Sequence, residues 1–319
     1  KYGGAIPRYT SYPTAVELSP CRSQGPALDA LKQCRNTALN LYVHLPYCPN
    51  LCYFCACNKI RSTSPEDNPH YLKLLRKECE LISLLSGARL KIAALHLGGG
   101  SPSFLSVNEL EELDQILNSF FEVSPHASKS IEVDPRTFTP HKAACAAALG
   151  FNRASVGVQD FDWRIQRIIN RNQSAALSKE CVTYLRKAGM QSINLDLIYG
   201  LPEQTLDGFR KTALRAVELR PERISLFGYA HVSWKAGAQT MLEKYRLPNP
   251  AERIQLFLAA LTVFCNAGYK YIGLDHFALP HDELYQADEQ GMLKRTFMGY
   301  VAGDFSGTLA LGSSAISDL

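Results

Sequence analysis

The chain has 319 residues, of which 46% are hydrophobic and 20% are charged, and its formal net charge is +4 at pH 7. This is a globular composition, and no apolar stretch reaches the ~18 residues that a membrane-spanning helix needs, so we expect no membrane span. Lys and Arg form no long block, which argues against nucleic-acid binding, while the small surplus of cations suits a small polyanionic substrate.

The first 40 residues predict an irregular N-terminal arm. Pro7-Arg-Tyr-Thr-Ser-Tyr-Pro13 is rich in turn-forming and aromatic residues, and a short helical pattern follows near 27–37. We expect this arm (1–40) to lie over a main body that runs from 41 to 319.

From residue 41 onward, apolar strand patterns alternate with amphipathic helical patterns. The predicted strands cover 41–45, 93–97, 130–133, 153–158, 192–198 and 223–227. The predicted helices cover 68–85, 106–121, 140–148, 161–169, 174–188, 205–219 and 252–267, with Ser106 and Glu109 as a capping box and Gly268 as a helix stop. Such β-then-α repeats predict an α/β fold of parallel strands joined by right-handed crossovers.

These strands allow either an open doubly wound sheet or a barrel. Almost every predicted strand ends in polar residues or glycine, and functional groups collected at the carboxyl ends of many strands favour a barrel face. Six repeats predict an incomplete (β/α)6 TIM-type barrel that is open on one side. A complete eight-stranded barrel would need two more strands, for which 271–273 and 309–311 are the candidates.

Four of the ten cysteines, Cys48, Cys52, Cys55 and Cys57, fall within ten residues. The spacing C-x3-C-x2-C of the first three is that of neither a zinc ribbon nor a common ferredoxin. Thiolates select zinc, copper(I) or iron–sulfur clusters. A zinc site would need Cys57 as its fourth ligand, but the C-x-C spacing of Cys55 and Cys57 makes it hard for both sulfurs to point at one metal ion. A [4Fe–4S] cluster on three thiolates would leave one iron without a protein ligand. Buried thiols without metal are a third reading. The other six cysteines are scattered, which favours a reducing compartment.

A glycine-rich segment, Gly98-Gly-Gly-Ser-Pro102, follows the second predicted strand. Three glycines let backbone N–H groups approach a ligand, and no Gly-Lys-Ser/Thr follows, so this is not a Walker loop. The segment is either a tight strand-to-helix turn or, beside an open iron, a cradle for the carboxylate and amine of an amino-acid moiety.

The cysteine motif, with Phe54 before its third cysteine, and the glycine segment together resemble the radical S-adenosylmethionine enzymes. Over nearly its whole length the chain also resembles a narrower family, the oxygen-independent coproporphyrinogen III oxidases. Besides the arm, the segments that carry this closer resemblance are Tyr42-Val-His-Leu-Pro-Tyr-Cys48, Cys52-Tyr-Phe-Cys-Ala-Cys-Asn-Lys-Ile60, Ile131-Glu-Val-Asp-Pro-Arg136, Gly157-Val-Gln-Asp160, Asn170-Arg-Asn-Gln173, Asn194-Leu-Asp-Leu-Ile-Tyr-Gly-Leu-Pro202 and Gly273-Leu-Asp-His-Phe277.

The resemblance implies a radical oxidoreductase of porphyrin and haem biosynthesis that works without oxygen. In the family, a [4Fe–4S] cluster binds S-adenosylmethionine and cleaves it to a 5′-deoxyadenosyl radical. The radical removes hydrogen from the β-carbon of a propionate, and loss of CO2 and one electron leaves a vinyl group. Two propionates of coproporphyrinogen III react in this way and give protoporphyrinogen IX.

Matched position by position, the resemblance implies cluster ligation by Cys48, Cys52 and Cys55, with Cys57 not a ligand. It implies contacts to the cluster-bound S-adenosylmethionine from Tyr42, Gly99, Glu132 and Ile316. It implies contacts to a second S-adenosylmethionine beside the first from Phe54, Gly100, Ser101, Gln159, Arg171, Asp196 and Ala230. A carboxylate suits ribose hydroxyls or a cationic amine, and an arginine suits a carboxylate.

Four further residues have alternative readings. Arg8 and Arg136 are candidates for contacting the substrate's propionates, although surface arginines are common. His44 and His96 lie in or beside strands, where lone histidines are more often satisfied core residues than ligands.

The chain departs from the family near its end. The stretch before Gly312-Ser-Ser-Ala-Ile-Ser317 differs from the family's threonine- and glutamine-containing stretch. The family also has a further, largely helical C-terminal domain that helps to cover the substrate, and we expect this domain to be absent from a chain that ends at Leu319.

A haem-chaperone branch of the same family is the alternative function, because it keeps the cluster motif but delivers haem. That branch usually has Asp-Phe-Asn after the third cysteine, where this chain has Ala56-Cys57-Asn58, and the N-terminal arm also favours the oxidase. The remaining expectations are coproporphyrinogen III as the substrate, an electron donor such as a flavodoxin or ferredoxin, a monomeric state and a cytoplasmic location.

Overall fold

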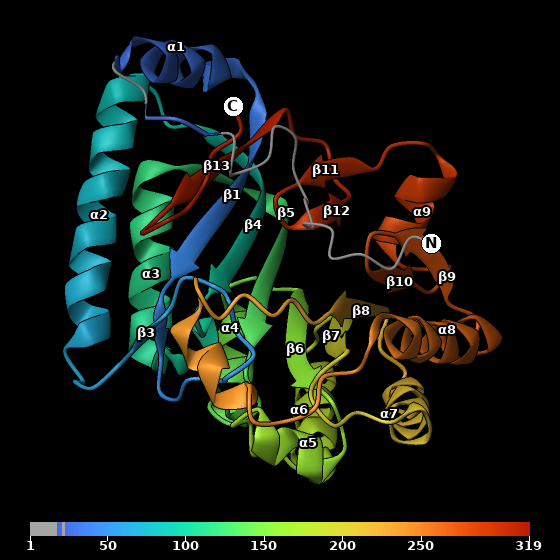
Figure 1. Cartoon of the computed structure of the whole chain (residues 1–319). Helices are drawn as coiled ribbons and strands as arrows, with labels where there is room; N and C mark the ends of the chain where they lie inside the picture. Colours follow the sequence, from blue (N-terminus) through green and yellow to red (C-terminus); the bar gives the residue numbers. More distant parts are fainter. Residues whose placement is uncertain (1–17, 21–22) are drawn as a thin grey trace.

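A computed structural model describes residues 18–20 and 23–319 of the chain (Figure 1). The motif Pro7–Pro13, with Arg8, lies outside these residues. Where the arm is described, it forms helix α1 (Gly25–Gln33) and the short 3-10 helix η2 (Cys34–Asn36), close to the predicted helical pattern.

The six predicted strands lie side by side and parallel, in chain order, within a nine-stranded sheet of order β13-β1-β4-β5-β6-β7-β8-β10-β9. They are β1 (Ala38–Leu45), β4 (Lys91–Gly99), β5 (Glu122–Val133), β6 (Arg153–Gln159), β7 (Ser192–Tyr199) and β8 (Arg223–Gly228). The parallel order confirms the predicted β/α repeats.

Both candidate extra strands exist, but they do not complete a barrel. β13 (Gly307–Leu311) pairs in parallel with β1 at one edge. At the other edge, β10 (His276–Ala278) pairs antiparallel with β8, and β9 (Lys270–Gly273) pairs antiparallel with β10. The two outermost strands, β13 and β9, are not neighbours in the sheet, so the barrel is open, as predicted.

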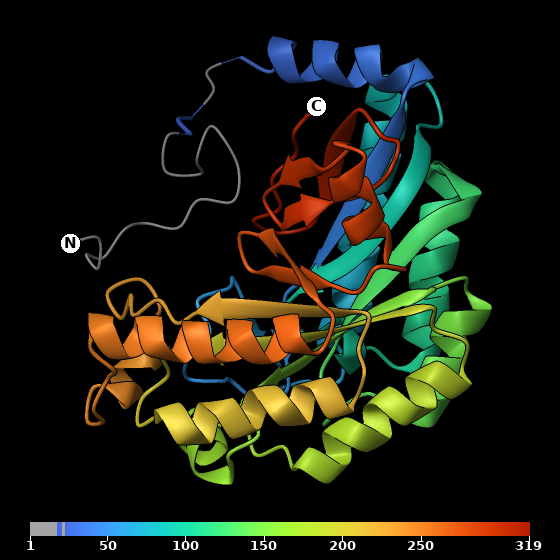
Figure 2. The ribbon, with the colours of Figure 1, turned by 90° about the vertical axis from the view of Figure 1, so that its right-hand side faces the viewer.

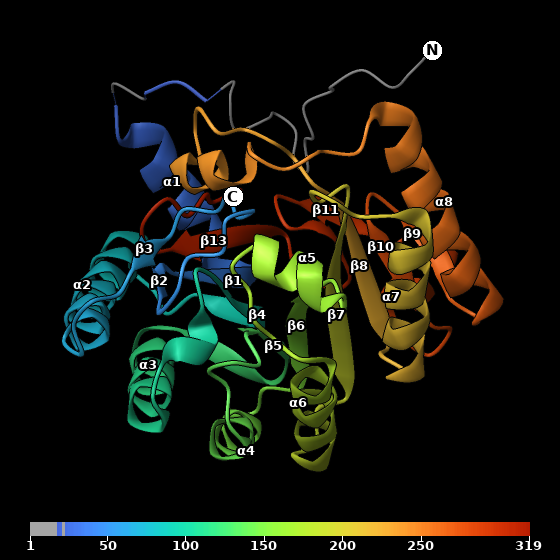
Figure 3. The same ribbon diagram turned by 60° about the horizontal axis from the view of Figure 1, so that its bottom comes forward.

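Helices cover the outer face of the curved sheet (Figure 3). They are α2 (Asp67–Ser86), α3 (Val107–Phe120), α4 (Pro140–Ala148), α6 (Ala175–Lys187), α7 (Leu206–Glu218) and α8 (Pro250–Asn266). The short helix α5 (Trp163–Ile168) lies instead beyond the carboxyl ends of the strands, where Ile165 packs in a separate cluster with Leu242. Helices α7 and α8 pack against each other beside β7 and β8 (Figure 2). The predicted capping box at Ser106 and Glu109 is present. Among the described residues, no helix has both the length and the apolarity that crossing a membrane requires.

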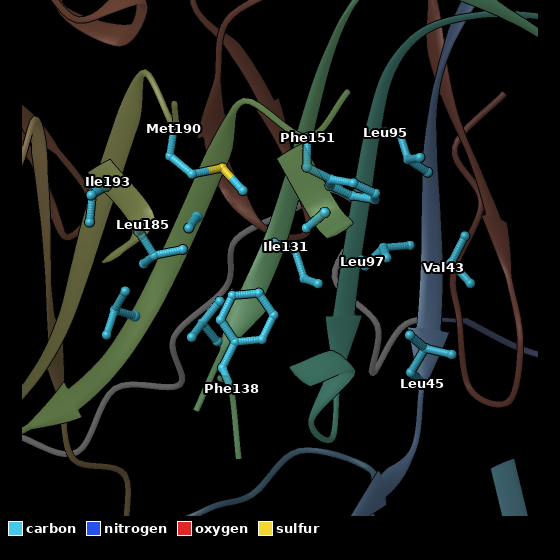
Figure 4. Packing of buried hydrophobic residues seen from close by; sticks show 14 of the residues in the cluster. Val43, Leu45, Leu95, Leu97, Ile131, Phe138, Phe151, Leu185, Met190 and Ile193 are labelled. Carbon is cyan, nitrogen blue, oxygen red and sulfur yellow. The ribbon is translucent and has the colours of Figure 1, made fainter. Parts of the chain in front are cut away.

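Alternate residues of each strand face the helices and form the core. Val43, Leu45, Leu95, Leu97 and Ile131 are buried there (Figure 4). Because successive side chains of a strand point to opposite faces, the residues between them face the concave side of the sheet.

Several short elements lie between the main strands and helices, and some of their residues line the concave side. These are β2 (Tyr47–Cys48), β3 (Ile60–Arg61), the 3-10 helices η3 (Pro102–Phe104) and η4 (Gly237–Leu242), α9 (Glu283–Glu289), β11 (Lys294–Thr296) and β12 (Gly299–Val301). β11 and β12 form an antiparallel hairpin that the sequence analysis did not predict.

Candidate functional site

A cavity of about 780 Å³ lies on the concave side of the sheet. Its lining includes side chains and backbone from the carboxyl ends of β1, β4, β5, β6, β7 and β8. Every residue predicted to contact the cluster or S-adenosylmethionine is in this lining: Tyr42, Cys48, Cys52, Phe54, Cys55, Gly99, Gly100, Ser101, Glu132, Gln159, Arg171, Asp196, Ala230 and Ile316. The fold therefore brings together residues from distant parts of the sequence.

The cysteine loop is anchored by backbone and side-chain hydrogen bonds to its surroundings. β2 and β3 pair in parallel and close the loop at its base, where the backbone N–H of Ile60 donates to the carbonyl of Pro46 at 2.8 Å. At its middle, the N–H of Tyr53 donates to the carbonyl of Ile169 at 3.0 Å, and the side-chain amide of Asn170 donates to the carbonyl of Leu51 at 2.8 Å. The end of α5 thus supports the loop.

The four neighbouring thiols differ in burial. Cys48 and Cys52 are buried, Cys55 is partly buried, and Cys57 is exposed. Burial, followed by the neighbouring thiols of Cys55 and Cys52, raises the pKa of Cys48 to about 12. A hydrogen bond with Cys57 lowers the pKa of Cys55 to about 6. Cys57 is thus the most exposed of the four thiols, which is compatible with the prediction that it is not a ligand.

The arrangement of these thiols fits a cluster better than a single zinc ion. Within the described residues, no three His, Cys, Asp or Glu side chains are gathered closely enough to hold one metal ion. A structural zinc needs four ligands around one centre, whereas each cysteine of a [4Fe–4S] cluster binds a different iron and can stand further from the others. Guanidinium nitrogens of Arg136 and Arg171, each 3.5 Å from the sulfur of Cys52, would offset the negative charge of such a cluster.

The glycine segment turns tightly against the start of the cysteine loop. The N–H of Gly100 donates to the carbonyl of Leu45 at 2.8 Å, and the N–H of Gly99 donates to a carboxylate oxygen of Glu132 at 3.2 Å. A Cβ on Gly100 would lie only 2.4 Å from the carbonyl oxygen of Pro46. The segment therefore serves as a close turn, which one of the two sequence readings predicted, and it also lines the cavity.

We expect Gly100→Ala to destabilise the cofactor-free protein by about 1–3 kcal/mol, because the new methyl group collides with backbone that cannot rotate away. Urea unfolding of the two proteins measures this difference. Gly237→Ala is the control, since a Cβ there meets no atom within 4 Å, and it should change stability by less than about 0.5 kcal/mol. Equal stability of Gly100→Ala and the wild type would contradict the predicted collision.

Tyr42, His96 and Glu132 form one wall of the cavity. The Tyr42 ring stacks on the His96 ring with centroids 5.8 Å apart, and His96 Nε2 lies 3.3 Å from a Glu132 oxygen. Burial and the Glu132 charge raise the pKa of Tyr42 well above its usual value, so this hydroxyl stays protonated. His44 is buried, and its two ring nitrogens lie 3.1 Å from the Tyr42 hydroxyl and 2.9 Å from the Asn58 carbonyl oxygen, as expected for a satisfied core histidine.

Asp196 lines the cavity from β7, which is separated from the strand of Glu132, β5, by β6 alone. Its two oxygens accept hydrogen bonds from the Ser155 hydroxyl at 2.8 Å and the Asn194 amide at 2.7 Å. Burial is the main cause that raises the pKa of Asp196 to about 6, and the Glu132 charge adds to it. Asp196 is therefore mostly ionised at pH 7, with lone pairs left for further donors.

Arg171 and Gln159 are both constrained by the end of β6. Arg171 is buried and donates to the carbonyl of Gly157 at 2.8 Å and to Gln173 at 3.1 Å, so it is not an ordinary solvated arginine. Gln159 has a backbone φ of +70°, which is costly for a residue other than glycine. Strain of this kind concentrates at functional sites.

Phe54 and Ala230 are brought together by one glutamine that the sequence analysis did not single out. The fully buried amide of Gln239 donates to the Phe54 carbonyl at 2.8 Å and to the Ala230 carbonyl at 3.1 Å. η4 thus fixes the cysteine loop against the end of β8.

The sequence analysis missed part of the cavity lining. The hairpin β11–β12 and the residues after it contribute an apolar group: Phe297, Met298, Val301, Ala302 and Phe305. The Phe297 ring meets the Tyr42 ring edge-to-face, with centroids 4.8 Å apart. Arg136, a candidate for contacting the substrate's propionates, lines the cavity and lies against Asp134 and Cys52.

Known proteins resemble the chain both in sequence and in structure. Residues 42–216 match the Radical SAM superfamily. The oxygen-independent coproporphyrinogen III oxidase of Pseudomonas aeruginosa is 40% identical over 100% of this chain and 70% of its own length. The corresponding Escherichia coli enzyme is 40% identical over 99% of this chain and 69% of its own length.

The chain belongs to the oxygen-independent coproporphyrinogen III oxidase family. A solved structure of the Escherichia coli family member, described as a radical SAM enzyme, superposes with a TM-score of 0.93 at 39% identity, over 97% of this chain and 71% of the other. As in this family, the chain uses a [4Fe–4S] cluster and S-adenosylmethionine. The thiols and the neighbouring guanidinium groups fit the cluster, and the carboxylates in the cavity fit the polar groups of S-adenosylmethionine.

Proposed function

We propose that the chain catalyses the oxygen-independent oxidative decarboxylation of two propionate side chains of coproporphyrinogen III to vinyl groups, giving protoporphyrinogen IX. The observation that carries this proposal is that three cysteine thiols and two carboxylates, Glu132 and Asp196, line one cavity at the carboxyl ends of the strands. The relatives named as oxidases at 40% identity support it.

Cys48, Cys52 and Cys55 are the proposed cluster ligands. When bound, the cluster and S-adenosylmethionine supply the 5′-deoxyadenosyl radical that removes hydrogen from a propionate β-carbon. The pairing of β2 with β3 and the hydrogen bond from Tyr53 to Ile169 position the loop that carries the three thiols.

Two sets of residues position S-adenosylmethionine in this proposal. The contacts of the cluster-bound molecule are Tyr42, Gly99, Glu132 and Ile316. The contacts of a second molecule are Phe54, Gly100, Ser101, Gln159, Arg171, Asp196 and Ala230. Glu132 and Asp196 accept hydrogen bonds from ribose hydroxyls or from the amine, and Arg171 donates to a carboxylate.

The protein's own contribution to the chemistry is positioning and exclusion of water. The apolar group on the β11–β12 side, including Phe297, faces the polar strand ends and shields the radical from side reactions. A flavodoxin or ferredoxin as electron donor, a monomeric state and a cytoplasmic location complete the proposal.

Anaerobic incubation with coproporphyrinogen III, S-adenosylmethionine and a reductant tests this function. We expect protoporphyrinogen IX together with two molecules of 5′-deoxyadenosine for each product molecule. Tight haem binding without 5′-deoxyadenosine would instead assign the chain to the haem-chaperone branch, against which the Ala56-Cys57-Asn58 sequence argues.

A further inference from the structure

Two arginines contact the sulfur of Cys52, one aspartate pairs with both arginines, and the proposed function assigns no role to Arg136 and Asp134. Arg136 Nη2 and Arg171 Nη1 each lie 3.5 Å from this sulfur. Asp134 lies between the arginines, 2.6 Å from Arg136 Nη2 and 3.4 Å from Arg171 Nη1. The three charged groups therefore form one group around a single cluster ligand, and we call it the Cys52 charge cluster.

The Cys52 charge cluster is well shielded from solvent. The side chains of Arg136, Asp134 and Arg171 are 17%, 11% and 7% exposed, respectively. Charges at this depth are screened much less by salt than surface charges are. Their effect on a neighbouring metal group is therefore larger than that of ordinary surface ion pairs.

The positions of these charges are fixed by the fold. Asp134 follows the last residue of β5, and its N–H donates to the Ser103 hydroxyl at 2.9 Å. Arg136 donates three hydrogen bonds to the Asp134 carboxylate, from its backbone N–H, its Nε and its Nη2. Arg171 is held by the Gly157 carbonyl. The guanidinium groups are thus aimed at Cys52 without help from a ligand.

We infer that the Cys52 charge cluster sets the reduction potential of the iron–sulfur cluster, with Arg136 raising it and Asp134 lowering it. This inference rests on the cluster assignment made above. Reduction adds one negative charge to the metal group, and nearby N–H donors and positive charge stabilise that added charge. The two arginines and the aspartate sum to one net positive charge, so removing Arg136 and removing Asp134 must shift the potential in opposite directions.

Opposite shifts separate this role from a structural one. A variant that merely disturbs the cysteine loop would lose iron or have a broadened spectrum. The sign of its potential shift would not depend on whether a positive or a negative charge had been removed. In this role Arg136 acts on the reduction potential through its positive charge, and the role does not depend on contact with the substrate.

The chain contains a matched control for Arg136. Asp162 and Arg164 repeat the same two-residue spacing, with Arg164 Nη2 at 2.7 Å from the carboxylate and its backbone N–H donating at 2.9 Å. The Arg164 side chain is 63% exposed and lies outside the cavity lining. Arg164→Gln therefore removes an ion pair of the same kind, but it does not remove a charge near Cys52.

The test is a redox titration of reconstituted protein, without S-adenosylmethionine, monitored by electron paramagnetic resonance. We expect Arg136→Gln to have a lower midpoint potential than the wild type, Asp134→Asn a higher one, and Arg136→Lys and Arg164→Gln a potential close to that of the wild type. Iron content is measured in every sample.

Equal potentials of the wild type, Arg136→Gln and Asp134→Asn, with iron content retained, would overturn the inference, as would shifts of the same sign. If Arg136→Gln fails to retain iron, the sign of the Asp134→Asn shift decides. A wild-type protein that assembles no cluster would contradict the proposed function itself, which keeps the two failures distinguishable.

Discussion

Cys52→Ser protein, reconstituted under anaerobic conditions, should lack the brown colour and the roughly four irons per chain of the wild type. Serine offers a hard oxygen in place of the soft thiolate that iron–sulfur clusters select. Cys52 is buried, and one guanidinium nitrogen each of Arg136 and Arg171 lies 3.5 Å from its sulfur. Iron analysis and the visible absorption spectrum measure the loss.

Cys57→Ser is the matched comparison, and we expect it to retain the full iron content. Cys57 is exposed and is the cysteine whose pKa is raised by its hydrogen bond to Cys55. Equal loss of iron in Cys52→Ser and Cys57→Ser would contradict the three-ligand assignment. It would indicate that Cys57 also binds metal, as a four-thiolate site of the zinc type requires.

Asp196→Asn should weaken S-adenosylmethionine binding at pH 8 by roughly ten- to a hundredfold without loss of iron. The carboxylate of Asp196 is the strong acceptor on its wall of the cavity, and an amide forms weaker hydrogen bonds with the same donors. The substitution keeps the shape of the side chain, and Ser155 can rotate to suit it. Equilibrium binding, with iron content measured on the same samples, checks the expectation.

The pH dependence of binding supplies the control for Asp196. Because its pKa is raised to about 6, the wild-type carboxylate is ionised above this pH and becomes protonated below it. Wild-type affinity should therefore fall as the pH is lowered through about 6, whereas Asp196→Asn should lack this component. Identical affinities and profiles of the two proteins would remove Asp196 from the site.

The central part of the fold was predictable because its patterns are local. Strand residues such as Leu41 and Val43 alternate with polar neighbours, helix α3 carries its capping box, and Gly268 follows the end of α8 with a φ of +91°. Each of these signals lies within a few residues, and together they indicate the order of strands and helices along the chain.

Three short strands and part of the site were not predicted in this way. β10, β11 and β12 are three residues long and are defined by their pairing partners rather than by their own periodicity. The contact of Phe297 with Tyr42 joins segments far apart in the sequence, and nothing local shows that Arg136 turns towards Cys52 rather than towards solvent. Such features depend on the assembled fold.

The resemblance of the motifs to a known family predicted more of the site residues than the spacing of the cysteines alone did. The cysteine pattern left zinc and cluster readings open, and Arg171 alone would have been read as a surface residue. The structure shows that Arg171 is buried and that Cys57 is the exposed thiol. Which side chains touch each S-adenosylmethionine stays a prediction.

The most direct test of the proposed function follows hydrogen from substrate to cofactor product. Coproporphyrinogen III that carries deuterium at the propionate β-carbons is incubated anaerobically with the reconstituted protein, S-adenosylmethionine and a reductant. We predict 5′-deoxyadenosine with one deuterium, formed together with the vinyl product. Unlabelled 5′-deoxyadenosine with no vinyl product, under conditions where the iron content is complete, would contradict the proposed reaction.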